Sequence, residues 1–444
     1  MKILHYSLGF PPYRTGGLTK FCMDLMREQV REGHEVGLIW PGVIRFFNHE
    51  IDIRKGKSID EIKNFEIINP LPVPFDEGIK VFDAFVQEGS KKVYENFFSE
   101  IEPDVIHVHT LMGLHKSLLN VAKEKKIRLI FTAHDFFPIC PKVTMFRQGS
   151  ICKSADLCGD CAVCNNTALS LFKIQILQSS LYRELKDSRL VKKLRKQHRD
   201  KYLMDGMKRE LSGSAGIVQD YKRLRNHFYN MLSMMDIIHY NSSVTKMVYE
   251  SFFDLPRNTV IGITHSDIED NRKRKKFSND KLRIRYLGPQ AECKGYFLLK
   301  TALDKIWEHR RDFCLDVHFS PMEPSPYIMV HGKYDYSDLE QIFEETDILV
   351  APSLLYETFG YTVLEALSYG VPVIISGTVG AKDILADGCG IVINNINGQK
   401  VYDVMSKLDV SNLQLMNNAI VNNQYIMTIN EMADKIMTKC YLGD

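Results

Sequence analysis

Two glutamates stand eight positions apart in residues 357–365, which read ETFGYTVLE. The apolar run at residues 348–353 predicts a strand before them, and Gly370 and Pro372 end the helix that follows. We therefore expect Glu365 about one turn inside a helix and Glu357 in the loop that precedes it. Both carboxylates would then flank the first turn of that helix.

The first turn of a helix carries backbone amides that have no partner inside the helix, and such amides attract anions. A carboxylate on each side of an anion site suits a diphosphate that joins two sugars, because each sugar offers hydroxyl groups to a carboxylate. In the alternative interpretation, Glu357 and Glu365 are ordinary solvent-facing side chains, one of them near a favourable helix start.

A pair of glycines, Gly16 and Gly17, lies between a predicted strand and a helix that begins near Leu18. Glycines at this place let backbone amides approach a phosphate or a sugar at the positive end of a helix dipole. A plain turn is the alternative. The chain lacks the Gly-x-Gly-x-x-Gly pattern here, which argues against a nicotinamide or flavin enzyme.

Five of the ten cysteines fall within 25 residues: Cys140, Cys152, Cys158, Cys161 and Cys164. In a reducing compartment such clustering indicates a metal rather than disulfides. Two overlapping Cys-x2-Cys steps suit tetrahedral thiolate coordination, so we expect structural zinc, with an iron–sulfur cluster or free thiols as alternatives. A catalytic zinc is not expected, because a thiolate-only site leaves no open position.

Two histidines alternate with apolar residues in the next predicted strand. His107 and His109 are expected to face opposite sides of that strand, with His107 packed in the core and His109 near the loop end, where it could line a ligand site.

Short apolar runs alternate with helical periodicity along the whole chain, which indicates parallel sheets covered by helices on both faces. Strands are expected at residues 3–7, 35–40, 104–110, 128–134 and 236–241. The alternation then begins again, with strands expected at 282–288, 314–320, 327–332, 348–353, 371–376 and 390–393. The predicted fold class is α/β, with two doubly wound, Rossmann-like domains and ligands beyond the carboxyl ends of the strands.

The alternation places the domain boundaries. We expect one domain at residues 1–265 with a cysteine-rich and basic helical insertion at about 138–211, a second at 266–425, and a C-terminal helix at 426–444 that packs back toward the first domain. The basic run at residues 271–276 is the predicted hinge, and a solvated charged loop is its alternative.

The 57 basic and 55 acidic residues give no global field, so no nucleic-acid partner is expected. No apolar run approaches the roughly 18 residues of a spanning helix, and no signal peptide is recognised, so a cytoplasmic location is predicted. Residues 169–211 interleave basic side chains with leucines. Such a helix can lie on the inner face of a membrane, and a solvated insertion packed on its domain is the alternative.

These segments together resemble glycosyltransferase family 4, the retaining two-domain transferases of the GT-B fold. The glutamate pair with Phe359-Gly360 inside it, continuing to residue 373 as EALSYGVPV, is similar to the family signature. Further similar segments are PPYRTGGL at 11–18, DVIHVH at 104–109, FTAHD at 131–135 and Lys294-Gly295. A subset of the family carries a cysteine-rich insertion with four cysteines, which Cys140, Cys152, Cys161 and Cys164 match best, with Cys158 as an alternative ligand.

The resemblance implies roles for individual residues. Glu357, His134 and Lys294 would be catalytic: Glu357 and His134 would contact the transferred sugar, and Lys294 would contact the donor diphosphate. The donor would also be bound by Gly16 and Gly17 from the opposite domain, the amides of Phe359 and Gly360, and Glu365 at the ribose.

The resemblance also implies an activity. Residues 1–265 would form the acceptor side, and residues 266–425 would bind a UDP- or GDP-sugar. The enzyme would be a retaining hexosyl or glycosyl transferase of the EC 2.4 type, needing no catalytic metal. Its acceptor would be a hydroxyl of a sugar or lipid-linked molecule in cell-surface polysaccharide or glycoconjugate biosynthesis.

One position departs from the family pattern. An arginine commonly follows the glycine that ends the strand at 282–288, and here that position is Pro289. The missing charge would have to come from elsewhere, with Arg14 as a candidate. The departure favours an alternative, a catalytically weak or silent nucleotide-sugar-binding subunit of a glycosylation complex. A GT-B sugar-nucleotide epimerase is a further alternative, and such an enzyme should lack the glutamate pair.

Overall fold

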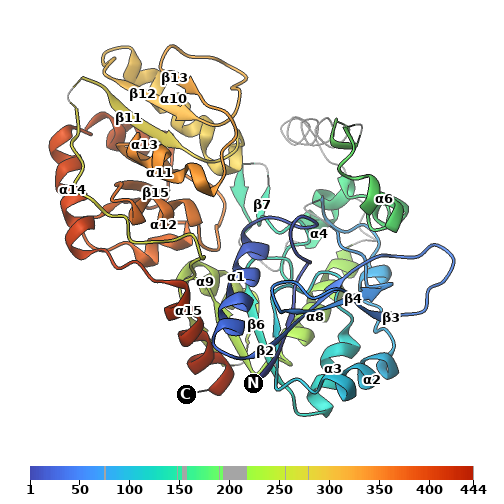
Figure 1. Cartoon of the computed structure of the whole chain (residues 1–444). Helices are drawn as coiled ribbons and strands as arrows, with labels where there is room; N and C mark the ends of the chain where they lie inside the picture. Colours follow the sequence, from blue (N-terminus) through green and yellow to red (C-terminus); the bar gives the residue numbers. More distant parts are fainter. Residues whose placement is uncertain are drawn as a thin grey trace.

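Two separate sheets divide the chain into an N-terminal and a C-terminal half, seen at the lower right and upper left of Figure 1. The computed structural model describes residues 1–74, 77–147, 149–152, 158–189, 191–193, 218–255, 257–278 and 280–443. Within these residues no helix is both long and apolar enough to cross a membrane.

The N-terminal sheet has the order β10-β9-β6-β5-β1-β2-β4-β3, and only the edge strand β3 runs antiparallel to its neighbour. Buried apolar side chains dominate most of the other strands, as expected where helices cover both faces. The bounds are β1 (Lys2–Tyr6), β2 (Glu35–Pro41), β3 (Asp52–Lys55), β4 (Lys63–Ile68), β5 (Val105–Val108), β6 (Arg128–Ala133), β9 (Ile237–Tyr240) and β10 (Asn258–Val260).

The C-terminal sheet is parallel throughout, in the order β13-β12-β11-β14-β15-β16. Counted along the chain this is the doubly wound order 3-2-1-4-5-6, so its topological switch point lies between β11 and β14. The bounds are β11 (Leu282–Tyr286), β12 (Phe313–Val317), β13 (Ile328–Val330), β14 (Ile348–Ala351), β15 (Val373–Ser376) and β16 (Gly390–Ile393).

Helices connect the strands of both sheets. Those of the N-terminal half are α1 (Gly17–Arg31), α2 (Lys91–Ile101), α3 (Lys116–Glu124), α4 (Cys158–Cys164), α5 (Leu171–Leu177), α6 (Ser180–Leu185), α8 (Val218–Leu232) and α9 (Ser243–Glu250). Those of the C-terminal half are α10 (Tyr296–Trp307), α11 (Leu339–Glu344), α12 (Tyr361–Ser368), α13 (Gly398–Ser406), α14 (Val410–Asn423) and α15 (Ile429–Ile436).

The last helix returns to the N-terminal half, where Figure 1 shows α15 in red beside α1 and close to the N-terminus. A π-helical turn, Met437–Leu442, continues α15 and touches β6. Arg128 at the start of β6 donates from Nε to the carbonyl of Cys440 at 2.8 Å. The domain boundaries at 265/266 and 425/426 stay predictions.

The predicted fold class is confirmed, and the expected strands all appear, most of them one to three residues shorter. The short β3 and the strand β4 were not predicted. The run at residues 271–276 is also more than a solvated loop: Lys275 Nζ donates to the Glu344 carbonyl at 3.2 Å, and Arg272 Nη1 donates to the Ile420 carbonyl at 2.9 Å. Burial lowers the pKa of Lys275 to about 8.

Candidate active site

Glu357 is held by its own backbone beside Val379, in the segment that follows β15. Its amide donates to the Thr378 carbonyl, its carbonyl accepts from the Gly380 amide, and both distances are 3.0 Å. These bonds form a parallel bridge to Val379, which sets the direction of the side chain. The Glu357 carboxylate lies 3.1 Å from Lys294 Nζ, with the two side chains 20% and 32% exposed. The predicted catalytic pair therefore meets where solvent and ligands have access.

Lys294 closes a short 3-10 turn, Glu292–Lys294, after β11. The next residue, Gly295, has a φ of 76°, and a Cβ there would lie 1.9 Å from the Pro352 carbonyl oxygen. Only glycine fits so close to another backbone in this conformation. The Lys294-Gly295 pair thus packs the lysine turn against the end of β14, the strand that leads to Glu357.

Two helix N-termini from opposite halves meet next to the Lys294–Glu357 pair. Gly360 caps α12 with a φ of 108°, and a Cβ at Gly17, the first residue of α1, would lie 3.4 Å from the Tyr361 ring. Helix geometry leaves the first amides of both helices without internal partners. The phenolic oxygen of Tyr361 is buried, and the described residues offer it no hydrogen-bond partner. The junction therefore suits an anionic, hydrogen-bonding ligand.

Phe359 and Gly16 contribute through their backbones. The Phe359 side chain is buried in the core at 3% exposure, and its carbonyl accepts from the Ala381 amide. Gly16 precedes α1 with a φ of 119°, and a Cβ there would meet open space. Such a φ favours glycine, so the chain keeps the entrance to α1 free of a side chain.

Glu365 is buried, so the solvent-facing alternative is wrong for this residue. Its carboxylate is 3.3 Å from His265 Nε2, and both side chains are nearly inaccessible. The rings of Tyr336 and Tyr361 stand 5.0 and 5.1 Å from the His265 ring. Sequence reasoning missed His265, because no spacing links it to a glutamate 100 residues away.

Charged groups of α1 join the two halves next to Glu365. Lys20 Nζ lies 2.7 Å from Asp24 and 2.6 Å from Asp267, and Asp24 also accepts from the Ser266 amide at 2.9 Å. Lys20 Nζ stands 5.1 Å from the centre of the Tyr336 ring. These contacts fasten α1 over the region around Glu365, and no sequence motif marks them.

His134 follows β6 and faces the Glu357 segment through its backbone, since its carbonyl accepts from Thr358 Oγ1 at 3.0 Å. Its ring lies edge-on to Phe21, with centroids 4.6 Å apart, and its Nε2 is 3.2 Å from His109 Nδ1. Burial lowers the pKa of His134 to about 3, so the imidazole is neutral at physiological pH.

The expectation that His107 and His109 face opposite sides is wrong. Their rings lie 4.1 Å apart, on the same face of the sheet. Side chains alternate with a period of two along a strand, so positions 107 and 109 share a face. Both rings are fully buried and join His5 of β1.

Pro289 has a structural contact in place of a charge. Its carbonyl accepts from the Tyr286 hydroxyl at 2.8 Å, which fixes the turn that leads from β11 to Lys294. Arg14, the candidate replacement for the missing arginine, stacks over the Tyr13 ring at 5.3 Å in the N-terminal half.

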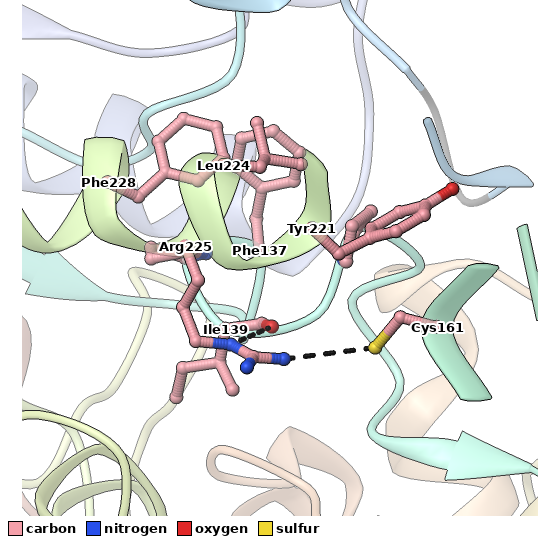
Figure 2. A pocket seen from close by; sticks show the side chains of 9 residues that line it. Phe137, Ile139, Cys161, Tyr221, Leu224, Arg225 and Phe228 are labelled. Carbon is pink, nitrogen blue, oxygen red and sulfur yellow. Dashed lines mark hydrogen bonds between the residues drawn. The ribbon is translucent and has the colours of Figure 1, made fainter. Parts of the chain in front are cut away.

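The cysteine-rich insertion packs against α8. Figure 2 shows the Arg225 guanidinium extending from α8 between the Ile139 carbonyl, 3.4 Å from Nε, and the Cys161 sulfur, 3.8 Å from Nη2. Between Cys140 and Cys161 the chain makes a short hairpin of β7 (Phe146–Arg147) and β8 (Ser150–Ile151). The insertion is therefore anchored to the core of its half.

The predicted metal ligands share this region without forming a coordination shell. Burial, followed by the proximity of Cys140 and Cys164, raises the pKa of Cys152 to about 11. Within the described part of the chain, three potential ligand atoms come within 4.8 Å of one another only at the histidines His5, His107 and His109. The side chain of Cys158 lies outside that part. Thiolate coordination of zinc stays a prediction.

The fold has relatives among solved structures. Sucrose-phosphate synthase from Thermosynechococcus elongatus is 12% identical with a TM-score of 0.55, covering 98% of this chain and 97% of that one. Anabaena Alr3699/HepE, solved in complex with UDP and glucose, is 12% identical with a TM-score of 0.54 over 99% of both chains. The two Rossmann-like halves thus have the GT-B fold.

Family models match both halves. The model described as Glycosyltransferase Family 4 matches residues 15–157, and the one described as Glycosyl transferases group 1 matches residues 287–408. The chain belongs to the family-4-like GT-B glycosyltransferases. An uncharacterized glycosyltransferase of Methanocaldococcus jannaschii, MJ1607, is 22% identical over 416 residues, which cover 90% of this chain and 85% of that protein.

Two further relatives match in part. They are uncharacterized 41.2 and 42.6 kDa proteins "in cps region" of Klebsiella pneumoniae, 30% and 23% identical over 132 and 163 residues. The matches cover 28% and 34% of this chain, and they span only 36% and 41% of those two proteins' own length.

Proposed function

We propose that this protein is a retaining glycosyltransferase that moves a sugar from a UDP- or GDP-sugar to a hydroxyl group of a sugar or lipid-linked acceptor. The observation that carries the proposal is the Lys294–Glu357 pair, 3.1 Å apart beside the N-termini of α1 and α12. A cation for the diphosphate stands next to a carboxylate for the sugar hydroxyls, at the junction of the two halves.

The chemistry follows from these groups. The leaving group is a nucleoside diphosphate, so negative charge grows on its phosphate oxygens as the sugar departs. Lys294 and the first amides of α12 would stabilise that charge, while Glu357 would accept hydrogen bonds from the sugar. The relatives described as proteins in a cps region support a role in cell-surface polysaccharide or glycoconjugate synthesis.

The experiment is a thermal-shift screen with a panel of UDP- and GDP-sugars, followed by transfer assays with the nucleotide sugars that bind. Because a bound ligand raises the melting temperature by mass action, the donor should stand out against its own free nucleotide. Proton NMR of the product would then show whether the anomeric configuration is retained. An inverted product would refute the retaining mechanism, and a panel without any shift would refute nucleotide-sugar binding.

Pro289 favours a second candidate, a weak or silent nucleotide-sugar-binding subunit. The resemblance leads one to expect a guanidinium at this position, and proline has no charged side chain. Its carbonyl accepts from the Tyr286 hydroxyl instead. The subunit reading predicts donor binding without hydrolysis or transfer by the purified protein. Slow hydrolysis of the same donor would instead establish an enzyme.

We also propose peripheral contact with the inner face of a membrane through α5 and α6. Phe172, Ile176, Leu181 and Leu185 expose 40% to 64% of their surface there. Two neighbouring basic residues face the protein instead: Arg183 pairs with Glu66 at 2.6 Å, and Lys186 donates to the Pro12 carbonyl at 3.2 Å. Much of the basic stretch, from residue 194 onward, lies outside the described residues.

The membrane proposal is tested by co-sedimentation with vesicles containing anionic lipid. Leu181→Asp should weaken binding several-fold, because it places a charge in the apolar face. Leu415→Asp, at an equally exposed leucine of α14, is the matched control and should bind as the unmodified protein does. Equal binding by all three proteins, or none by the unmodified one, would overturn the proposal.

Finally, we propose a structural zinc ion held by Cys140, Cys152, Cys161 and Cys164. The four thiols belong to one insertion, and one of them, that of Cys161, lies 3.8 Å from Arg225 Nη2 of α8. Zinc prefers thiolates and would stabilise the insertion by binding them.

A further inference from the structure

A continuous chain of hydrogen bonds runs from His134 through the core to the end of β10. It passes through residues of α1, β1, β5, β6, β9 and the C-terminal turn. In order, its links are His134 Nε2 to His109 Nδ1 (3.2 Å), His109 Nε2 to His5 Nδ1 (2.9 Å), His5 Nε2 to Gln29 Oε1 (2.7 Å), Gln29 Nε2 to Tyr441 Oη (3.0 Å), Tyr441 Oη to His107 Nδ1 (2.8 Å), His107 Nε2 to Thr132 Oγ1 (2.6 Å), Thr132 Oγ1 to His239 Nδ1 (2.9 Å) and His239 Nε2 to the Ile261 carbonyl (2.9 Å).

The far end of the chain fixes its direction. A carbonyl oxygen only accepts, so His239 must donate from Nε2 to Ile261. A neutral imidazole has one donor nitrogen, so His239 Nδ1 accepts from the Thr132 hydroxyl. That hydroxyl has a single proton, so it accepts in turn from His107 Nε2. His107 Nδ1 is then an acceptor for the Tyr441 hydroxyl.

The direction continues through a side-chain amide. Because the Tyr441 hydroxyl donates its only proton to His107, its oxygen accepts from the Gln29 amide nitrogen. Gln29 Oε1 is thereby turned to His5, which donates to it from Nε2. His5 Nδ1 accepts from His109 Nε2, and His109 Nδ1 accepts from His134 Nε2. Every link thus has one donor and one acceptor, and all point the same way.

This pattern of donors and acceptors requires neutral imidazole rings, and burial keeps them neutral. Desolvation lowers the pKa of His5 and of His239 to about 4 and that of His134 to about 3. It lowers the pKa of His107 and His109 well below the usual value, with repulsion from the other imidazoles as a lesser cause. Each ring therefore carries one proton at physiological pH.

The same contacts argue against a cation at the three close histidines. His5, His107 and His109 bring potential ligand atoms within 4.8 Å of one another. All six of their ring nitrogens already take part in the chain. A metal ion would have to break these links and would gain no carboxylate or thiolate from the cluster.

We propose that Tyr441, Gln29 and Thr132 are positioning residues that hold His134 in the Nε2–H tautomer, so that Nδ1 accepts a hydrogen bond from a hydroxyl of the transferred sugar. No hydrogen bond among the described residues uses His134 Nδ1. The part concerning the sugar rests on the proposed function, and the part concerning the tautomer does not.

Tyr441 is the link that decides the tautomer. Without its hydroxyl, the Gln29 amide is free to rotate and donate to His5 Nε2. The reversal then passes to His109 and leaves His134 protonated at Nδ1. The C-terminal turn, 334 residues away in sequence from His107, thus acts on the candidate active site.

The experiment measures the tautomer directly. In protein labelled with 15N-histidine, the two ring nitrogens of a neutral imidazole have separate shifts, and the His134 signals are assigned by their loss in His134→Asn. We expect a pure Nε2–H form in the unmodified protein and a mixture of tautomers in Tyr441→Phe. Thr132→Val should also give a mixture, and Thr132→Ser should restore the pure form. Tyr6→Phe is the matched control, because it loses a buried hydroxyl that donates to the Met112 carbonyl and takes no part in the hydrogen-bond chain.

Affinity gives the second readout. If half of the molecules hold the wrong tautomer, the donor's Kd rises about twofold, and it rises further as that form predominates, so a two- to tenfold loss is expected in Tyr441→Phe. The Kd of the free nucleoside diphosphate should not change, because His134 would meet only the sugar. A mixed or Nδ1–H tautomer in the unmodified protein overturns the proposal. So does a pure Nε2–H form in both Tyr441→Phe and Thr132→Val, or an equal response of Tyr6→Phe. If no nucleotide sugar binds at all, the proposed function fails while the tautomer result stands on its own.

Discussion

Glu357 and Lys294 neutralise each other at 3.1 Å, and each can exchange its partner for a part of the donor. In the proposed function, the donor diphosphate would attract the ammonium group, and sugar hydroxyls would then satisfy the carboxylate. Neither group is left as an isolated charge before the donor arrives, which would be unfavourable in a partly buried place.

Replacing Glu357 tests the carboxylate. Glu357→Gln should lower the rate of sugar transfer at least about 100-fold, the scale of one lost charged contact at a transition state. The measurement is kcat/KM for transfer with saturating acceptor. Glu308→Gln, at an exposed position after α10, should keep the full rate. An active Glu357→Gln protein would sink the site assignment.

Replacing Lys294 tests the cation. Lys294→Ala should weaken donor binding by about 2 to 4 kcal/mol, because a charge-assisted contact to the diphosphate is lost. Calorimetry with the donor and with its free nucleoside diphosphate should show the same loss. Lys300→Ala, whose ammonium pairs with Asp304 on α10, is the control. An unchanged Kd would mean that another cation holds the diphosphate.

Sequence reasoning reached the residues that lie in short motifs and missed those that meet only through folding. Glu357 and Lys294 were expected as partners of the same ligand, and the structure places them in contact. His265 bonds to Glu365 across 100 residues and Tyr441 to His107 across 334. No local pattern announces such pairs, because the tertiary fold alone decides which buried polar group receives which partner.

At the scale of elements, the start of α12 depends on the backbone of Gly360. Its φ of 108° is strained for a residue with a Cβ, and that Cβ would lie 3.0 Å from Val379 Cγ1. Gly360→Ala should therefore destabilise the fold by about 1 to 3 kcal/mol and displace the helix start. Denaturant unfolding measures the first effect. Gly398→Ala, where a Cβ meets nothing within 4 Å at the start of α13, should leave stability equal or slightly higher. Equal unfolding curves for both variants would show that the Gly360 backbone is not constrained.

The sheet that carries the buried histidines should make the protein sensitive to acid. Their folded-state pKa values, about 4 for His5 and His239, lie below the usual 6.5, so between these values only the unfolded chain binds the proton. The free energy of unfolding should hence be constant above about pH 7 and fall below pH 6.5 by about 1.4 kcal/mol per pH unit for each histidine.

Denaturant unfolding at pH 7, 6 and 5 measures this slope. Burial also lowers the pKa of His115 to about 4. The His115 ring is not part of the hydrogen-bond chain and is bonded to the Tyr94 hydroxyl instead. His115→Gln should therefore reduce the pH slope of the unfolding free energy by the contribution of one histidine, about 1.4 kcal/mol per pH unit. His49→Gln, at an exposed position, is the control and should not change it. A stability independent of pH from 5 to 7 would contradict the buried, neutral state.

Elements were predictable where their pattern was strong. Continuous apolar runs predicted the parallel strands, because both faces of those strands are buried. The edge strand β3 reads DIRK and is largely exposed, so it carries no apolar run. The strand that carries His107 and His109 is predictable from its apolar run. The period of two along that strand places both side chains on one face, so the prediction of opposite faces applied the period wrongly.

At the scale of the whole molecule, the two halves are joined at several places around the candidate site. The Thr358 carbonyl accepts from Ser242 Oγ at 2.6 Å and from Thr245 Oγ1 at 3.0 Å, both at the start of α9. The tip of the β7–β8 hairpin reaches the other half too, because a Cβ at Gly149 would lie 3.2 Å from Glu292 Oε1. Figure 1 shows this hairpin between the halves. The cysteine-rich insertion is thereby a neighbour of the turn that carries Lys294.

If the insertion holds structural zinc, the metal should stabilise this bridge. Metal analysis of purified protein should give about one equivalent of zinc, and Cys161→Ser or Cys164→Ser should lose it together with melting temperature or soluble yield. Cys158→Ser is the matched control, since Cys158 is the spare thiol in the predicted set. Loss of metal from Cys158→Ser with retention in Cys152→Ser would exchange these two as ligands.

The effect on function should follow from the position of the hairpin. Removal of such a zinc ion would loosen the insertion, the Glu292–Lys294 turn would lose a neighbour, and transfer should fall along with stability rather than at one chemical step. Free thiols alone would also pack against α8 and Arg225, but chelation would then change nothing. Brown protein with visible absorption would indicate iron and sulfur instead. Metal-free protein with unchanged melting temperature and activity would show that the four thiols act only as packed side chains.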